Sequence, residues 1–143
     1  MFRTLDPSFL AAPQIEPVDV ATAAAQGVTT IVNNRPDGEE PSAPQGDAIA
    51  AAAAAHGLAY VAIPITHSGF SHAQIDALAA AIDASPGPIL AYCRSGTRST
   101  NLWALTRARM GDDVQTLCDK AAAQGYDLSG LRPTLDALAA GAA

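Results

Sequence analysis

The sequence predicts an α/β fold in which a short, mainly parallel β-sheet is flanked by helices. Short apolar runs alternate along the chain with alanine-rich segments, the order expected of parallel strands connected by helices. Several alanine-rich segments end at a glycine, which is a common signal for the end of a helix. Hydrophobic residues make up 49% of the chain but aromatic residues only 5%, so small side chains must fill the core.

The length and cysteine content indicate how the fold is stabilised. A chain of 143 residues can bury a sufficient core by itself, and we expect one domain over residues 1–143. Two cysteines, Cys93 and Cys118, are too few for a disulfide framework, and the sequence contains no Cys/His cluster of the metal-binding type. We therefore expect reduced thiols, with no metal and no cofactor.

The net charge limits the classes of partner. A formal charge of −6 disfavours general binding of nucleic acid or of anionic membranes, which needs a cationic surface. The N-terminus lacks the apolar core of a signal peptide, and no stretch reaches the roughly 18 apolar residues of a membrane span. We expect a cytoplasmic protein with no nucleic-acid or membrane partner, in which a local site binds any anion.

The first elements follow a repeating order. Residues 2–13 are expected to form a short strand and a turn. Residues 17–26 have helical composition and stop at Gly27, a helix C-terminal signal. Residues 28–32 are rich in β-branched side chains and form a strand, which runs into the polar loop 33–44.

The same order then repeats. Residues 46–56 form an alanine-rich helix and residues 58–65 an apolar strand, which leads into the loop 66–70. Ser71 is expected to cap a helix that runs to about residue 83, because apolar residues recur at helical spacing after it.

The second half contains the most informative segment. A Pro-Gly-Pro break precedes a buried strand at residues 89–92, followed by a loop at 93–98 and a helix at 99–110. Two closing helices are expected at 112–125 and 133–140.

Three loops should meet at one edge of this sheet. Ligands in parallel α/β folds bind outside the carboxyl ends of the strands. The loops 33–44, 66–70 and 93–98 all follow predicted strands, so we expect them to converge around a ligand site.

Cys93 is the predicted nucleophile of this site. It lies where a strand turns into a helix, and the first turn of a helix stabilises a thiolate through unpaired N–H groups and the helix dipole. Gly96 allows the loop to curl around an anion, and Arg98 offers a planar fork of donors to an oxyanion. Ser99 or Thr97 is expected to offer a hydroxyl to the sulfur.

The predicted site residues divide by role. We predict Cys93 and Arg98 as catalytic residues. The predicted anion-binding residues are Arg94, Ser95, Gly96, Thr97 and Ser99. Accessory roles are open to Arg35, Asp37 and His67, which lie on the two neighbouring loops. Cys118, within a later helix, is expected to be buried and inert.

A resemblance to a known family rests on residues 33–40, 63–65 and 92–99 and on Leu102-Trp103. These segments resemble the phosphatase-like domain of beta-lactamase hydrolase-like proteins, also called the DUF442 family. The resemblance extends over nearly the whole chain. It implies the fold of protein tyrosine phosphatases, with a Cys-Arg anion loop between a strand and a helix. Because the family is described both as phosphatases and as sulfur transferases, the resemblance leaves the reaction open.

Two features favour sulfur transfer. Phosphatases of this superfamily place five residues between the cysteine and the arginine, whereas four lie between Cys93 and Arg98, as in rhodanese-type sulfurtransferases. Phosphatases also use an aspartate on a neighbouring loop as general acid, and the loop 66–70 contains no carboxylate. Asp37 or His67 are the substitutes available for that role.

We therefore favour a sulfurtransferase that carries sulfane sulfur as a persulfide on Cys93. The alternative is a phosphatase that forms a cysteinyl-phosphate, and a non-catalytic anion-binding module is the third candidate. The expected partners are a small-molecule sulfur donor with a thiol acceptor, or a phosphoester substrate. The resemblance also suggests a partner enzyme of sulfide or persulfide oxidation.

Overall fold

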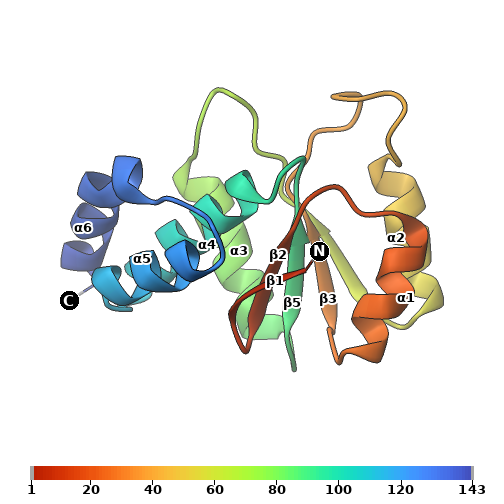
Figure 1. Cartoon of the computed structure of the whole chain (residues 1–143), viewed down its shortest axis with the longest axis horizontal. Coiled ribbons are helices and arrows are strands. Elements are labelled where there is room, and N and C mark those ends of the chain that lie inside the picture. Colours follow the sequence, from red (N-terminus) through yellow and green to blue (C-terminus); the bar gives the residue numbers. More distant parts are fainter. Residues whose placement is uncertain (1, 143) are drawn as a thin grey trace.

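The computed structural model describes residues 2–142, and a five-stranded sheet forms its centre (Figure 1). The strands are β1 (Arg3–Asp6), β2 (Phe9–Ala12), β3 (Thr30–Asn33), β4 (Ala59–Ala62) and β5 (Ile89–Tyr92). Their order across the sheet is β1-β2-β5-β3-β4. The β1–β2 pair is antiparallel and the other three neighbouring pairs are parallel, which confirms the predicted mainly parallel sheet.

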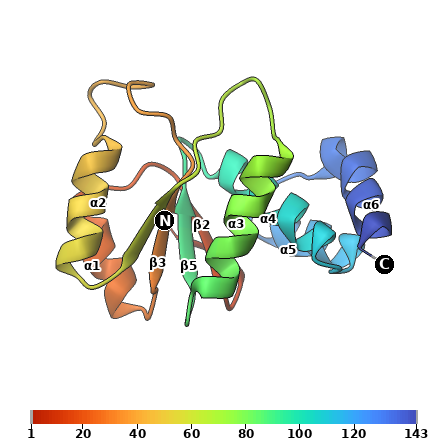
Figure 2. The same ribbon diagram turned by 180° about the vertical axis from the view of Figure 1, so that it is seen from behind.

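Helices cover both faces of the sheet. They are α1 (Pro17–Ala25), α2 (Gly46–Ala55), α3 (His72–Ala84), α4 (Thr97–Arg109), α5 (Val114–Ala123) and α6 (Arg132–Gly141). A short 3-10 turn, Ser129–Leu131, precedes α6. Helices α1 and α2 lie against one face, and α3 to α6 lie on the other (Figures 1 and 2). Among residues 2–142, no helix has both the length and the apolar composition needed to cross a membrane.

Successive side chains along each strand point to opposite faces of the sheet, so each face has its own core. In β5, Ile89 and Ala91 belong to the core under α3 to α6, whereas Leu90 and Tyr92 belong to the core under α1 and α2. This is the two-residue period of a strand buried on both sides. Trp103 of α4 is fully buried in the larger core, with its ring centroid 6.1 Å from that of Phe9 in β2.

Several element boundaries differ from the sequence prediction, and three of the differences bear on the architecture or the site. The segment 2–13 forms two paired strands, where one strand and a turn were expected. The predicted strand 58–65 is regular only over Ala59–Ala62. Beyond it, the Ile63 N–H bonds to the carbonyl at the end of β3, and the Ile65 N–H bonds to the carbonyl of the next residue. Helix α4 begins at Thr97, two residues earlier than predicted, so Arg98 lies within its first turn.

The cap of α3 is the clearest local prediction that the structure confirms. The Ser71 hydroxyl accepts a hydrogen bond from the Gln74 N–H at 3.3 Å, and the Gln74 side chain accepts one from the Ser71 N–H at 2.8 Å. Two N–H groups that the helix itself leaves unbonded are thus satisfied.

We expect Ser71→Ala to lower the free energy of unfolding by about 1 kcal/mol, because one of these N–H groups loses its partner. Urea denaturation measures this change. Ser42→Ala, in the exposed loop before α2, is the matched control and should stay within about 0.5 kcal/mol of wild type. Equal stability of the two variants would contradict the role of the cap.

Candidate functional site

Cys93 lies directly beyond the central strand β5, at the carboxyl edge of the sheet. Its N–H donates to the Ala12 carbonyl at 3.3 Å, which continues the pairing of β5 with β2 by one residue. The side chain is fully buried. The sheet therefore fixes the position of the sulfur, and α4 begins four residues later.

Gly96 provides the donor to this sulfur. Its N–H lies 3.1 Å from Cys93 Sγ. Gly96 has a φ of +90°, a left-handed conformation that residues with a Cβ adopt only under strain, and it precedes the first turn of α4. The predicted curl of the loop is confirmed at this residue. The positive end of the 13-residue helix α4 lies at the same place, which favours an anion there.

Two further contacts hold loop carbonyls away from the sulfur. The Arg94 carbonyl accepts from the Gln14 N–H at 3.3 Å. The Gly96 carbonyl accepts from both the N–H of Thr100, at 2.9 Å, and its hydroxyl, at 2.8 Å. In a trans peptide the N–H points opposite to the carbonyl, so these bonds leave N–H groups directed to the other side of the loop.

The loop hydroxyls do not make the bond to sulfur that the sequence suggested. The Thr97 hydroxyl pairs with that of Ser95 at 2.9 Å, and both residues are exposed. The Ser99 hydroxyl is buried and has no hydrogen-bond partner among residues 2–142. Arg94 is exposed. In this structure the sulfur accepts from a backbone N–H because the loop curls tightly at Gly96.

Arg98 connects the Cys93 loop to both neighbouring loops. Its Nη1 donates to the Ile65 carbonyl at 2.8 Å, at the entry to the loop 66–70. Its two terminal nitrogens bind the Glu39 carboxylate, at 2.9 Å from Nη1 to Oε2 and 2.7 Å from Nη2 to Oε1. Arg98 therefore joins the loop 93–98 to the loop 33–44 and to the residue that precedes the loop 66–70.

Glu39 is the residue of this site that sequence reasoning missed. Besides Arg98 it binds Arg35, whose Nε lies 2.8 Å from Glu39 Oε1. The Arg98 hydrogen bond is the main cause that lowers the Glu39 pKa from 4.5 to about 2, with Arg35 adding to it and burial opposing it. The Glu39 contact, joined by the nearby Cys93 sulfur, raises the Arg98 pKa above its ordinary value. The pair is thus fully charged at neutral pH.

The three accessory candidates have different surroundings. Arg35 is buried and reaches the site through Glu39, while its Nη1 donates to the Gln14 side chain at 2.9 Å. Asp37 instead accepts from the Gly46 N–H at 2.9 Å and so supports the start of α2. His67 is exposed in the loop 66–70, and no hydrogen bond joins it to another described residue.

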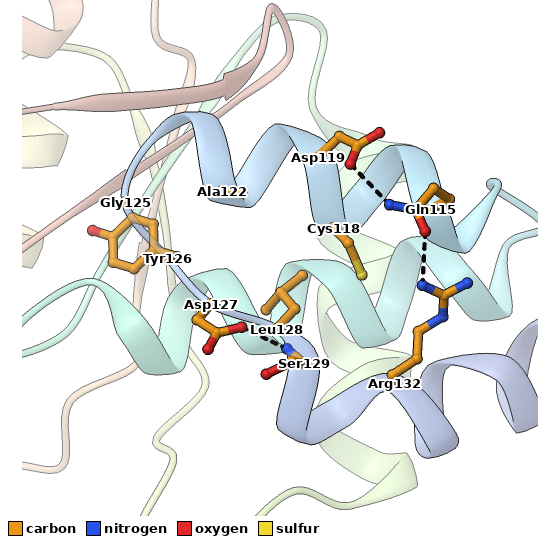
Figure 3. Close-up of a pocket in the computed structure, with 10 residues that line it drawn as sticks. All are labelled: Gln115, Cys118, Asp119, Ala122, Gly125, Tyr126, Asp127, Leu128, Ser129 and Arg132. Carbon is orange, nitrogen blue, oxygen red and sulfur yellow. Dashed lines mark hydrogen bonds between the residues drawn. The ribbon is translucent and has the colours of Figure 1, made fainter.

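A separate cavity of about 730 Å³ lies between α5 and residues 125–132 (Figure 3). It is lined by the partly buried thiol of Cys118 and by Tyr126, and by no residue of the loop 93–98. Within residues 2–142, no three His, Cys, Asp or Glu side chains lie together in an arrangement that could hold a metal ion.

Comparisons with known sequences give a consistent match. The family model described as "Beta-lactamase hydrolase-like protein, phosphatase-like domain" matches residues 1–110. A beta-lactamase hydrolase-like protein of Xylella fastidiosa is 41% identical over 109 residues, covering 73% of this chain, and one of Agrobacterium fabrum is 35% identical over 114 residues, covering 77%. The chain spans about a quarter of the length of these relatives, 25% and 26%.

Solved structures match over a longer range. A Neisseria meningitidis protein provisionally assigned as a phosphatase has a TM-score of 0.82 and 32% identity, covering 95% of this chain and 96% of its own. Human DUSP28 has a TM-score of 0.70 at 19% identity, covering 98% and 96%. A Shewanella putrefaciens DUF442 protein has a TM-score of 0.71 at 19% identity, covering 99% and 88%. The two more distant matches establish the fold.

The depressed Glu39 pKa predicts a pH-dependent contribution to stability. A carboxyl whose pKa is lower in the folded than in the unfolded state stabilises the protein fully at pH values above its ordinary, unfolded-state pKa. This contribution is lost as the pH falls through the folded-state pKa. Wild type should therefore lose stability between about pH 4.5 and pH 2 more steeply than Glu39→Gln. Thermal unfolding across this range measures the difference.

Glu40→Gln is the matched control for this experiment. Glu40 neighbours Glu39 but makes only a 3.4 Å contact with Arg35 and is 48% exposed. Its variant should follow the wild-type pH profile. If Glu39→Gln also follows that profile, the ion pair with Arg98 does not persist in solution.

Proposed function

The chain belongs to the family of beta-lactamase hydrolase-like phosphatase-like domains, and we propose on this basis that it is a cysteine-dependent phosphatase. One arrangement carries the proposal. The Cys93 sulfur accepts the Gly96 N–H at the start of α4, and Arg98 projects from the first turn of the same helix. The similarity over 95% of the chain to the Neisseria protein, at 32% identity, supports the phosphatase reading over the sulfurtransferase favoured by the sequence.

In the proposed reaction the Cys93 thiolate attacks phosphorus, forming an S–P bond as the ester P–O bond breaks. The leaving oxygen takes a proton from solvent or from the substrate's surroundings. Water then attacks phosphorus, the S–P bond breaks, and inorganic phosphate leaves with the thiolate restored. Loop N–H groups and Arg98 stabilise the charge on the phosphoryl oxygens in both steps.

The donors left available determine how Arg98 can act. The hydrogen bonds of Arg98 to Glu39 and to the Ile65 carbonyl all come from its two terminal nitrogens and none from Nε. We propose that an oxyanion binds this Nε edge together with the loop N–H groups. Glu39 would then hold the guanidinium in place during binding.

The proposed substrates are aryl phosphate monoesters. Glu39 is the carboxylate bound to Arg98, and at a pKa of about 2 it has no proton to donate at neutral pH. Asp37 is bonded to the start of α2. A phenol, with a pKa of about 10, leaves without a general acid more readily than an alkyl alcohol, which is a weaker acid.

Sulfur transfer is the second candidate, and the four-residue spacing between Cys93 and Arg98 favours it. The Cys93 thiolate would attack a sulfane sulfur, forming an S–S bond as the donor leaves as sulfite or a thiolate. An acceptor thiol would then take the outer sulfur and restore Cys93. A partner in sulfide or persulfide oxidation would belong to this reading. Either reaction needs a reduced thiol, so we propose a cytoplasmic location.

The phosphatase proposal is tested with p-nitrophenyl phosphate. Wild type should release p-nitrophenol, Cys93→Ser should have no activity, and Arg98→Ala should lose about 100-fold or more in kcat. Arg109→Ala is the control and should keep wild-type activity, because it removes an arginine at the end of α4 opposite to Arg98. Absence of turnover by wild type, or activity that survives Cys93→Ser, would refute the proposal.

The sulfur-transfer candidate is tested by intact mass after incubation with thiosulfate. If it is correct, wild type should gain about 32 Da, one sulfur atom, and the adduct should disappear on adding a thiol. Cys93→Ser should gain nothing, while Cys118→Ser should behave as wild type. Anion binding without either reaction would instead indicate a binding module.

A further inference from the structure

A tyrosine beyond the matched family region contacts the Cys93 loop. Tyr126 follows α5, whereas the family model matches residues 1–110. Its hydroxyl donates to the Ser95 carbonyl at 3.2 Å. Burial raises the pKa of Tyr126, so the hydroxyl keeps its proton and remains a donor at neutral pH.

Among residues 2–142, this contact acts on the one peptide whose N–H bonds to the Cys93 sulfur. The Ser95 carbonyl and the Gly96 N–H belong to the same peptide unit and point in opposite directions. With the carbonyl bonded to Tyr126, the N–H lies 3.1 Å from Cys93 Sγ. If this peptide rotated, it would present a carbonyl oxygen to the sulfur and replace a hydrogen-bond donor with a repelling acceptor.

The position of Tyr126 is itself defined from several sides. A Cβ on Gly96 would collide with the Tyr126 hydroxyl, so the ring lies closely over the loop. The Arg3 guanidinium also lies over the ring, 5.9 Å from its centroid, and the Arg3 Nη1 bonds to the Gln124 carbonyl at 2.9 Å. Figure 3 shows the hydroxyl pointing away from the other residues that line the cavity.

We propose that Tyr126 is a positioning residue, which holds the Ser95–Gly96 peptide so that its N–H stabilises the Cys93 thiolate. The proposal rests on the proposed function only in taking Cys93 as the nucleophile. It assigns a role in the reaction to the segment after α5, and it applies to either chemistry of the thiolate.

The test is the pH titration of thiolate absorbance in the ultraviolet. Each protein is measured against its own Cys93→Ser counterpart, which removes the signals of Cys118 and of the tyrosines. Tyr126→Phe keeps the ring and removes only the hydroxyl. At a fixed pH well below the midpoint of the wild-type titration, we expect its thiolate fraction to fall about three- to tenfold, the effect of weakening one hydrogen bond to a charged group.

Tyr60→Phe is the matched control. It removes the Tyr60 hydroxyl, which accepts a hydrogen bond from the Asn33 side chain at 3.0 Å. Tyr60 lies on the edge strand β4, so this variant should leave the thiolate fraction of Cys93 unchanged. An unchanged thiolate fraction in Tyr126→Phe would overturn the proposal, even if its melting temperature fell. The titration needs no turnover, so the two proposals can fail separately. If wild type does not hydrolyse p-nitrophenyl phosphate but Tyr126→Phe still lowers the thiolate fraction, the phosphatase proposal is refuted and the role of Tyr126 stands.

Discussion

The structure of the site depends on the hydrogen bond from the Gly96 N–H to the Cys93 sulfur. This bond requires the chain to turn from β5 into α4 within four residues, which the left-handed conformation of Gly96 permits. The turn brings the sulfur and the positive end of α4 together, and it places Arg98 in the first helical turn. The strand before this turn lies between β2 and β3, and Cys93 and Gly96 are both buried.

A group of charges connects this turn to the rest of the carboxyl edge. Arg98 and Arg35 share the Glu39 carboxylate, and Arg98 also binds the backbone at Ile65. Two guanidinium groups and one carboxylate therefore meet at this edge, and Arg35 also lies 3.4 Å from the Glu40 carboxylate. Because Glu39 occupies the terminal nitrogens of Arg98, it also limits which edge of the guanidinium a ligand can reach.

Much of the fold could be predicted from the sequence because its signals are local. The strand Ile89–Tyr92 and the Ser71 cap occur as predicted, since a buried apolar run and an N-cap motif act within a few residues. The hairpin at residues 2–13 was missed because pairing of β1 with β2 depends on β2 lying beside β5. The sequence prediction began this helix at Ser99 because it assigned Thr97 and Arg98 to the loop that curls around an anion. In the structure α4 begins at Thr97.

The sequence by itself determined the position of Cys93 between a strand and a helix, the need for glycine at residue 96, and the meeting of three loops beyond the sheet. Tertiary structure alone decided which partners those residues find. Glu39 and Arg98 are separated by 59 positions, and Ser95 and Tyr126 by 31. Contacts at such separations arise from the packing of loops and helices around the sheet, which no short-range pattern in the chain encodes.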